Sequence, residues 1–297
     1  MIHVLFAIDV NLLPGFLRLA MIKILYSFSC FIIPLLLLTG CASNEKQTEE
    51  VKEISTATWD DFQYPKVFFE LEDSVKAAEF VSYVPDLERR IKESALLIAK
   101  RLFDSVDQVP VVDTIDYRVY DFPGKAGKGG AAPKIFLVFS SRYFASLMDS
   151  SLTKEEINQE IIGTMIHDLS HAYHLQTEYD GDGPSVMEGL ADAIRYYEGY
   201  IDPSLQKVGR NWRHGFKPTA FFLIWINENK DQNFLKKLNT SLGKNPKWTW
   251  QKDFKDLTGL SVDSLWSEYQ TELINNNFPQ YSDEDKGKKA SKDVNLK

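Results

Sequence analysis

Two histidines four residues apart, His167 and His171, are the side chains of this sequence best suited to chemistry. The surrounding pattern predicts a helix from Glu155 to Gln176. Four residues make just over one helical turn, so both imidazoles leave the same face about 6 Å apart. Two ring nitrogens at that spacing can bind one tetrahedral zinc ion. A carboxylate from elsewhere can be the third ligand, which leaves the fourth position to water.

A second segment offers that carboxylate. Glu188 and Asp192 are again four residues apart, on a helix predicted from Ser185 to Glu198. We expect Glu188 to be the third ligand, and Asp192 to accept a hydrogen bond from a ligand histidine and so fix its tautomer. The alternative is that the histidines are packed core residues, that Glu188 caps its helix and that Asp192 faces water.

The residue after the first histidine is Asp168, where the usual zinc-hydrolase pattern has glutamate. A carboxylate at this position takes a proton from the attacking water and passes it to the leaving amine. Asp168 is one methylene shorter, which retracts its oxygens by about 1.5 Å. A shift of that size can lower the rate on the order of 100-fold.

A third histidine, His174, follows on the same predicted helix face. It lies one turn beyond His171, and an unbroken helix cannot bring three histidines to one ion. We therefore expect His174 to line the rim of the cleft rather than to bind metal.

A mixed set of elements must position these side chains. The segments Val67–Leu71, Ile115–Val119 and Ile135–Phe139 are predicted strands, and Gly124–Gly130 is a predicted loop or hairpin tip. A small mixed sheet in the N-terminal half, followed by a helical half, describes an α+β domain with a cleft at the histidine helix. The other predicted helices are 85–102, 219–229, 233–242, 250–257 and 262–274.

The first forty residues are predicted to be a secretory signal. An apolar run from Ile24 to Leu38 follows Lys23 and ends in small residues before Cys41. Its Leu-Thr-Gly-Cys ending resembles a bacterial lipoprotein signal, which implies a lipid on Cys41 and a membrane-anchored, extracytoplasmic protein. The alternative is a transmembrane anchor, for which this run is short against a ~30 Å bilayer core. Met21 is the expected start of translation.

The rest of the chain is expected to form one domain between two flexible ends. Residues 41–60 form a polar tether and residues 281–297 a disordered tail, which leaves residues 61–280 for the domain. The net charge of −8 argues against a nucleic-acid partner. Cys30 leaves with the signal and Cys41 carries the lipid, so neither a disulfide nor a cysteine metal ligand is expected in the domain.

Several stretches carry a further similarity. They are IIGTMIHDLSHAY (161–173), EGLAD (188–192), WRHGFKPTAFFL (212–223), SVDSLW (261–266) and the segment 135–143. Together they resemble the plant basic secretory protein family and its bacterial relatives, which are gluzincin-like zinc metallopeptidases. The resemblance implies a zincin-like architecture and zinc held by His167, His171 and Glu188. It also implies a peptide substrate lying along Ile135–Phe139 by strand addition.

Two departures from the family pattern concern catalysis. Asp168 stands where the family has its catalytic glutamate, and Phe216 stands where the family commonly has tyrosine. The tyrosine hydroxyl could have stabilised an oxyanion, and neighbouring His214 either supplies a donor instead or is a surface histidine. The leading hypothesis is a lipid-anchored zinc metallopeptidase. Its rivals are a catalytically weak relative kept as a binding or structural lipoprotein, and a scaffold that binds no metal.

Overall fold

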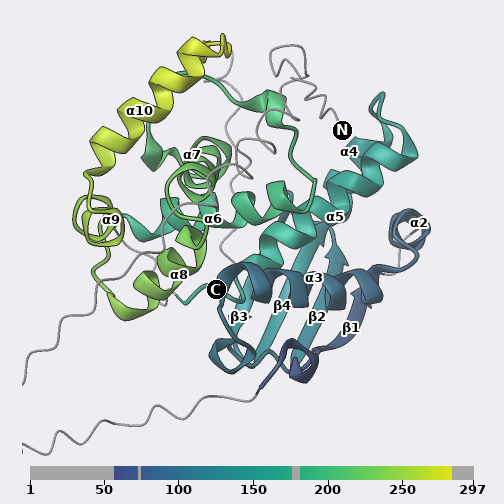
Figure 1. Cartoon of the computed structure of the whole chain (residues 1–297). Helices are drawn as coiled ribbons and strands as arrows, with labels where there is room; N and C mark the ends of the chain where they lie inside the picture. Colours follow the sequence, from purple (N-terminus) through teal and green to yellow (C-terminus); the bar gives the residue numbers. More distant parts are fainter. Residues whose placement is uncertain (1–56, 73–74, 176–180, 283–297) are drawn as a thin grey trace, which may run out of the picture. The chain divides into compact units, whose positions relative to one another are not determined.

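A computed structural model describes residues 57–72, 75–175 and 181–282, and of residues 75–78 only the backbone (Figure 1). The predicted signal and Cys41 lie outside the described residues. Within the described part of the chain, no helix combines the length and the apolar character that crossing a bilayer requires.

A four-stranded mixed sheet forms the N-terminal half. Its spatial order is β1-β2-β4-β3, in which β1, β2 and β4 run parallel and β3 runs antiparallel to β4. The inward face of β2 carries Ile115, Tyr117 and Val119, all buried, as the alternating pattern predicts. The strands are β1 (Lys66–Leu71), β2 (Thr114–Tyr120), β3 (Ala126–Ala131) and β4 (Lys134–Ser140).

The prediction that a peptide adds to Ile135–Phe139 is wrong, because this strand, β4, lies between β2 and β3 and pairs with both. The edge is instead β3, which takes up most of the glycine-rich stretch predicted to be a loop. Glycine has little intrinsic preference for strands, so the sequence pattern gave no sign of one. The glycine at position 129 has a packing reason, since a Cβ there would overlap the ring of Phe136 on β4.

Helices cover the inward face of this sheet. The helix α3 (Leu87–Leu102) packs against α5 (Lys154–Ser170), and α5 contacts β3 and β4 (Figure 1). Two shorter helices, α2 (Val75–Tyr83) and α4 (Ser141–Met148), flank α5 and the sheet. The sequence pattern had predicted neither of these two.

The C-terminal half is helical, as predicted. Its centre is α7, in which every residue from Phe221 to Ile226 is buried, so this apolar run belongs to the core. The helix α6 packs along α7 at Gly189, where a Cβ would overlap Thr219. The helices are α6 (Gly183–Tyr197), α7 (Phe216–Asn229), α8 (Phe234–Lys244), α9 (Trp250–Thr258) and α10 (Val262–Asn275).

The histidine helix α5 begins as predicted and ends earlier than predicted. Its first turn is closed by a capping box between Thr153 and Glu156. After Ser170 the chain tightens into a turn with bonds between residues three apart, among them the amide of Tyr173 to the carbonyl of Ser170. Asn239 of α8 then bonds the Tyr173 carbonyl and the Leu175 amide. This distant partner replaces helical bonds, so the predicted extension to Gln176 is wrong.

Candidate metal centre

Two helices bring the predicted ligands together. His167 lies in the last turn of α5, and His171 is the residue that caps this helix. Glu188 lies in the second turn of α6, which packs against α5. His167 is buried, whereas His171 and Glu188 are half-buried and face one another across the junction of the two helices.

The distances between the ligand atoms fit a single tetrahedral ion. His167 Nε2 lies 3.0 Å from Glu188 Oε2 and 3.4 Å from His171 Nε2, and the third side of this triangle, His171 Nε2 to Glu188 Oε2, is 3.7 Å. Two ligands that are each 2.0–2.1 Å from a tetrahedral zinc ion lie about 3.3 Å apart. The observed distances fall on both sides of this value, so the three side chains can hold one zinc ion with little movement.

Asp192 lies where it can orient the first of these ligands. His167 Nδ1 is 2.8 Å from Asp192 Oδ1, and the carboxylate is buried. When Nδ1–H donates to this carboxylate, the lone pair on Nε2 faces Glu188 and His171, as a metal ligand requires. Burial alone would lower the pKa of His167, but the charges of Asp192 and Glu188 outweigh it and raise this pKa well above its usual value.

Asp168 points to the sheet side of α5. One residue along a helix is a rotation of about 100°, so its side chain leaves a different face from His167. It is buried, with 3% of its surface exposed. Burial raises the pKa of the Tyr117 phenol on β2, and the charge of Asp168 raises it further. The carboxylate of Asp168 is therefore enclosed between α5 and the sheet.

Phe216 packs directly on the site. Its ring stacks on the His167 ring, with centroids 5.8 Å apart and planes 12° from parallel. Phe216 and the preceding Gly215 both have positive φ, at 46° and 70°. A non-glycine residue in this region is uncommon and strained. The start of α7 is thus held in a backbone conformation that places the Phe216 ring beside the candidate ligand His167. The sequence alone did not indicate this contact.

His214 is exposed and its ring bonds within its own turn. Its Nδ1 lies 3.2 Å from the backbone nitrogen of Asn211, which closes the short 3₁₀ turn Trp212–His214. The same side chain lines a surface pocket of about 490 Å³ together with Arg210 and Tyr281. The catalytic role of His214 stays a prediction, and the described contacts of its ring are those of a turn residue.

His174 is buried, so its predicted place on the cleft rim is wrong. The turn after Ser170 swings this ring inward, and His174 Nδ1 lies 3.3 Å from His171 Nδ1. It therefore meets the ring nitrogen of His171 that does not face the other ligands. Burial lowers the pKa of His171 to about 4, which keeps this ring neutral, the form that binds metal.

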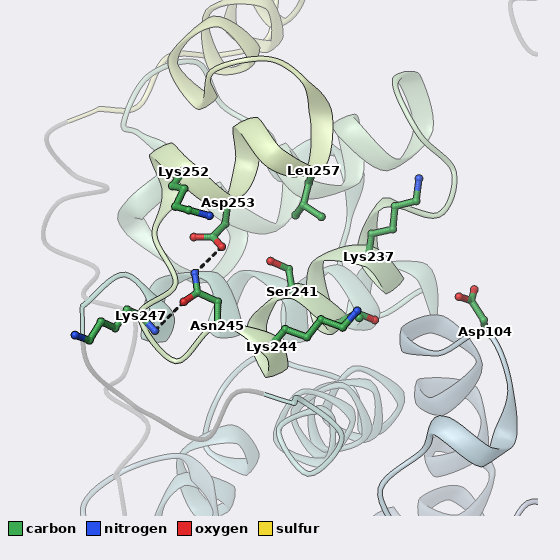
Figure 2. Close-up of a pocket in the computed structure, with 10 residues that line it drawn as sticks. Asp104, Lys237, Ser241, Lys244, Asn245, Lys247, Lys252, Asp253 and Leu257 are labelled. Atoms are coloured by element: carbon green, nitrogen blue, oxygen red, sulfur yellow. Dashed lines mark hydrogen bonds between the residues drawn. The ribbon is translucent and has the colours of Figure 1, made fainter. Parts of the chain in front are cut away.

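A pocket of about 660 Å³ opens between α8 and α9 (Figure 2). Two of the lysines that line it have acidic partners: Lys237 pairs with Asp231, and Lys252 with Asp256. Asn245 bonds Asp253 and thereby ties the loop before α9 to that helix. The described lining contains no histidine, so this pocket does not offer the chemistry of the histidine cluster.

Comparison with known families gives one match. The family model described as BSP, peptidase of plants and bacteria, matches residues 64–269. This segment includes the whole sheet and both helices that carry the candidate ligands. Neither the curated proteins nor the solved structures gave a match.

Proposed function

Because this chain belongs to the family of peptidases of plants and bacteria, we propose that it is a zinc metallopeptidase that cleaves peptide bonds. A lipid on Cys41 would anchor it to a membrane of the bacterial cell envelope, outside the cytoplasm. The observation that carries the proposal is the triangle of His167, His171 and Glu188, whose sides match those of a tetrahedral zinc site.

Each side chain then has a distinct part. A bound zinc ion supplies a polarised water with a pKa near 7. His167, His171 and Glu188 hold the ion, and Asp192 keeps the proton of His167 on Nδ1, away from the site. Asp168, which follows His167 on α5, is the carboxylate that would take up a proton during hydrolysis and return it to the leaving amine.

The substrate peptide is best placed on β3. This strand ends the sheet of the described residues, and an extended peptide can pair with the backbone groups of such an edge. The face of β3 is less suitable, because Gly127 and Gly129 are buried and the Phe136 ring lies against Gly129. The helix α5, with the metal ligands at its end, packs against this strand.

The rival proposal is a catalytically weak relative that serves as a binding or structural lipoprotein. Two observations favour it. Asp168 has a shorter reach than glutamate and is enclosed beside the sheet. Phe216 touches the ligand His167 but brings no hydroxyl to it. Neither change affects the metal ligands, so this rival retains the zinc site.

Metal content tests the site itself. Elemental analysis of the purified full chain should give about one zinc per molecule, and His167→Ala should abolish it. His214→Ala removes an exposed imidazole of the same kind and should keep the zinc. A native chain without zinc would overturn both the peptidase and its rival.

Assays of peptide hydrolysis distinguish the peptidase proposal from its rival. The native chain should cleave a mixed peptide library, a chelator should stop the cleavage, and Asp168→Glu should raise the rate on the order of 100-fold at unchanged zinc content. Cleavage by Asp168→Glu alone supports the rival. A zinc-loaded Asp168→Glu that cleaves nothing contradicts the peptidase proposal.

The anchor has its own test. Cells expressing the native chain should incorporate labelled fatty acid into it, and Cys41→Ser should not. Incorporation into Cys41→Ser, or none into the native chain, argues against the lipid at this position.

A further inference from the structure

We infer that His174 is a positioning residue for the metal centre: its Nδ1 accepts a hydrogen bond from the Nδ1–H of His171 and thereby keeps Nε2 of His171 free to bind metal. The inference rests on the proposed zinc site. It gives the second ligand an orienting partner, as Asp192 is for the first.

The geometry around His171 is two-sided. Its Nδ1 lies 3.3 Å from His174 Nδ1, and the two rings are nearly perpendicular, at 88° with centroids 5.1 Å apart. Its Nε2 lies 3.4 Å from His167 Nε2. One nitrogen of His171 therefore faces the ligand cluster and the other faces His174. This arrangement excludes His174 as a ligand of the same ion.

The fold fixes His174 in this position. The turn after α5 is held by Asn239 of α8, which bonds the residues on both sides, Tyr173 and Leu175. His174 itself is 8% exposed. Burial disfavours the charged form of an imidazole. A neutral imidazole has one nitrogen lone pair to offer as an acceptor.

Only one proton can lie between the two Nδ1 atoms, so there are two arrangements. If His171 donates, its Nε2 is free, and the proton of His174 lies on Nε2. If His174 donates, the proton of His171 lies on Nε2 and blocks coordination. Zinc binding therefore selects the first arrangement.

That arrangement leaves a buried N–H of His174 without a partner, since Nε2 of His174 has none among the described residues. An unpartnered buried donor is unfavourable. The acceptor for His171 is the neutral imidazole of His174, whereas the acceptor for His167 is the charged carboxylate of Asp192. A hydrogen bond to a charged acceptor is the stronger one. The second ligand is therefore held less firmly than the first.

Zinc affinity tests this role in the full chain, by competition with a chromophoric chelator. His174→Phe keeps a ring but removes the acceptor, and should weaken the affinity about 10- to 100-fold. His174→Gln supplies an amide oxygen as acceptor and should bind within about threefold of the native chain or more tightly. His214→Phe is the matched control and should bind as the native chain does.

Several results would overturn the inference. His174→Phe could bind zinc as tightly as the native chain, or His174→Gln could bind as weakly as His174→Phe, which would indicate a packing role. Equal thermal unfolding of the variants in chelator separates a local effect from a loss of folding. A native chain that binds no zinc defeats the proposed function as well, and is thereby distinguished from failure at His174 alone.

The proton can also be located directly. A long-range ¹H–¹⁵N NMR spectrum of the zinc-loaded native chain should show His171 protonated at Nδ1 and His174 at Nε2. A proton on Nδ1 of His174 would contradict the proposed hydrogen bond even if the affinities agreed.

Discussion

The pair of His167 and Asp192 shows how one carboxylate sets the behaviour of a ligand. The two groups are buried and 2.8 Å apart. The charge of Asp192 raises the pKa of His167 against the effect of burial, and the charge of His167 lowers the pKa of Asp192 in the same way. In the metal-free protein this pair stabilises the fold as an ion pair.

The pH dependence of the free energy of unfolding should reveal this ion pair. The raised pKa of His167 contributes stability that is complete below pH 6.5 and is lost as the pH rises through the pKa of the folded protein. The lowered pKa of Asp192 contributes stability that is lost as the pH falls below 3.8. In chelator, Asp192→Asn should therefore lower the free energy of unfolding most between about pH 4 and 6.5, measured by urea denaturation. A difference that is constant across pH would refute the ion pair.

Phe216 offers the second prediction at this scale. Phe216→Tyr should place a hydroxyl at the site, because the phenylalanine ring already stacks on His167. If the hydroxyl supports the transition state, kcat on a peptide substrate should rise roughly tenfold or more while zinc affinity stays unchanged. A change in KM alone would indicate ordinary substrate binding.

The cluster of His167, His171 and Glu188 could be predicted from sequence, because four-residue spacing puts side chains on one helix face, whatever surrounds the helix. The positions of His174 and Phe216 were not. The first depends on Asn239, which is 65 residues away in the chain, and the second on a left-handed backbone that no local pattern requires of phenylalanine.

Among the elements, the contact between α6 and α7 decides where Glu188 and Asp192 stand. The helices approach closely at Gly189, where a Cβ would overlap Thr219. Gly189→Ala should therefore push α6 away from α7, lower stability by about 1–3 kcal/mol and weaken zinc binding. Urea denaturation and chelator competition measure the two effects.

A second substitution should partly restore the stability and the zinc affinity that Gly189→Ala loses. Thr219→Ser removes the methyl group that a Cβ at position 189 would overlap and keeps the hydroxyl that donates to the Trp212 carbonyl. The double variant should lie between Gly189→Ala and the native chain in stability and in zinc affinity. If Thr219→Ser brings no recovery, the close approach at Gly189 is not the cause.

Some elements could be predicted from the sequence pattern and others could not. Alternation predicted β2, the continuous apolar run Ile135–Phe139 predicted β4, and helical periodicity predicted α5 to α10. The edge strand β3 has glycines where alternation would need apolar residues, and the end of α5 is set by α8. Both are decided by partners distant in sequence.

For the molecule as a whole, the candidate site joins the sheet-bearing half to the helical half. His167 and His171 come from α5 on the sheet, and Glu188 comes from α6 beside α7. The α+β class could be predicted from the order of strand and helix patterns. The way the two halves meet could not, because it depends on packing between helices.

Zinc should therefore stabilise the whole fold. At 100 times its dissociation constant, a ligand specific for the folded state adds about 2.7 kcal/mol. For a domain of this size that corresponds to a rise of roughly 5–10 °C in Tm. Calorimetry of the full chain with and without zinc should show this rise, and His167→Ala should show none. An unchanged native Tm at saturating zinc would contradict a site shared by both halves.

The early end of α5 also has an electrostatic effect on this junction. The aligned peptide dipoles of a helix place about half a negative charge at its carboxyl end, and this end lies at Ser170, beside both imidazoles. A helix continued to Gln176 would have carried that pole about 9 Å further along the axis. The backbone thus favours a cation here by about 0.3–1 kcal/mol, and a divalent ion that approached the cluster would meet an attractive field before any side chain coordinated it.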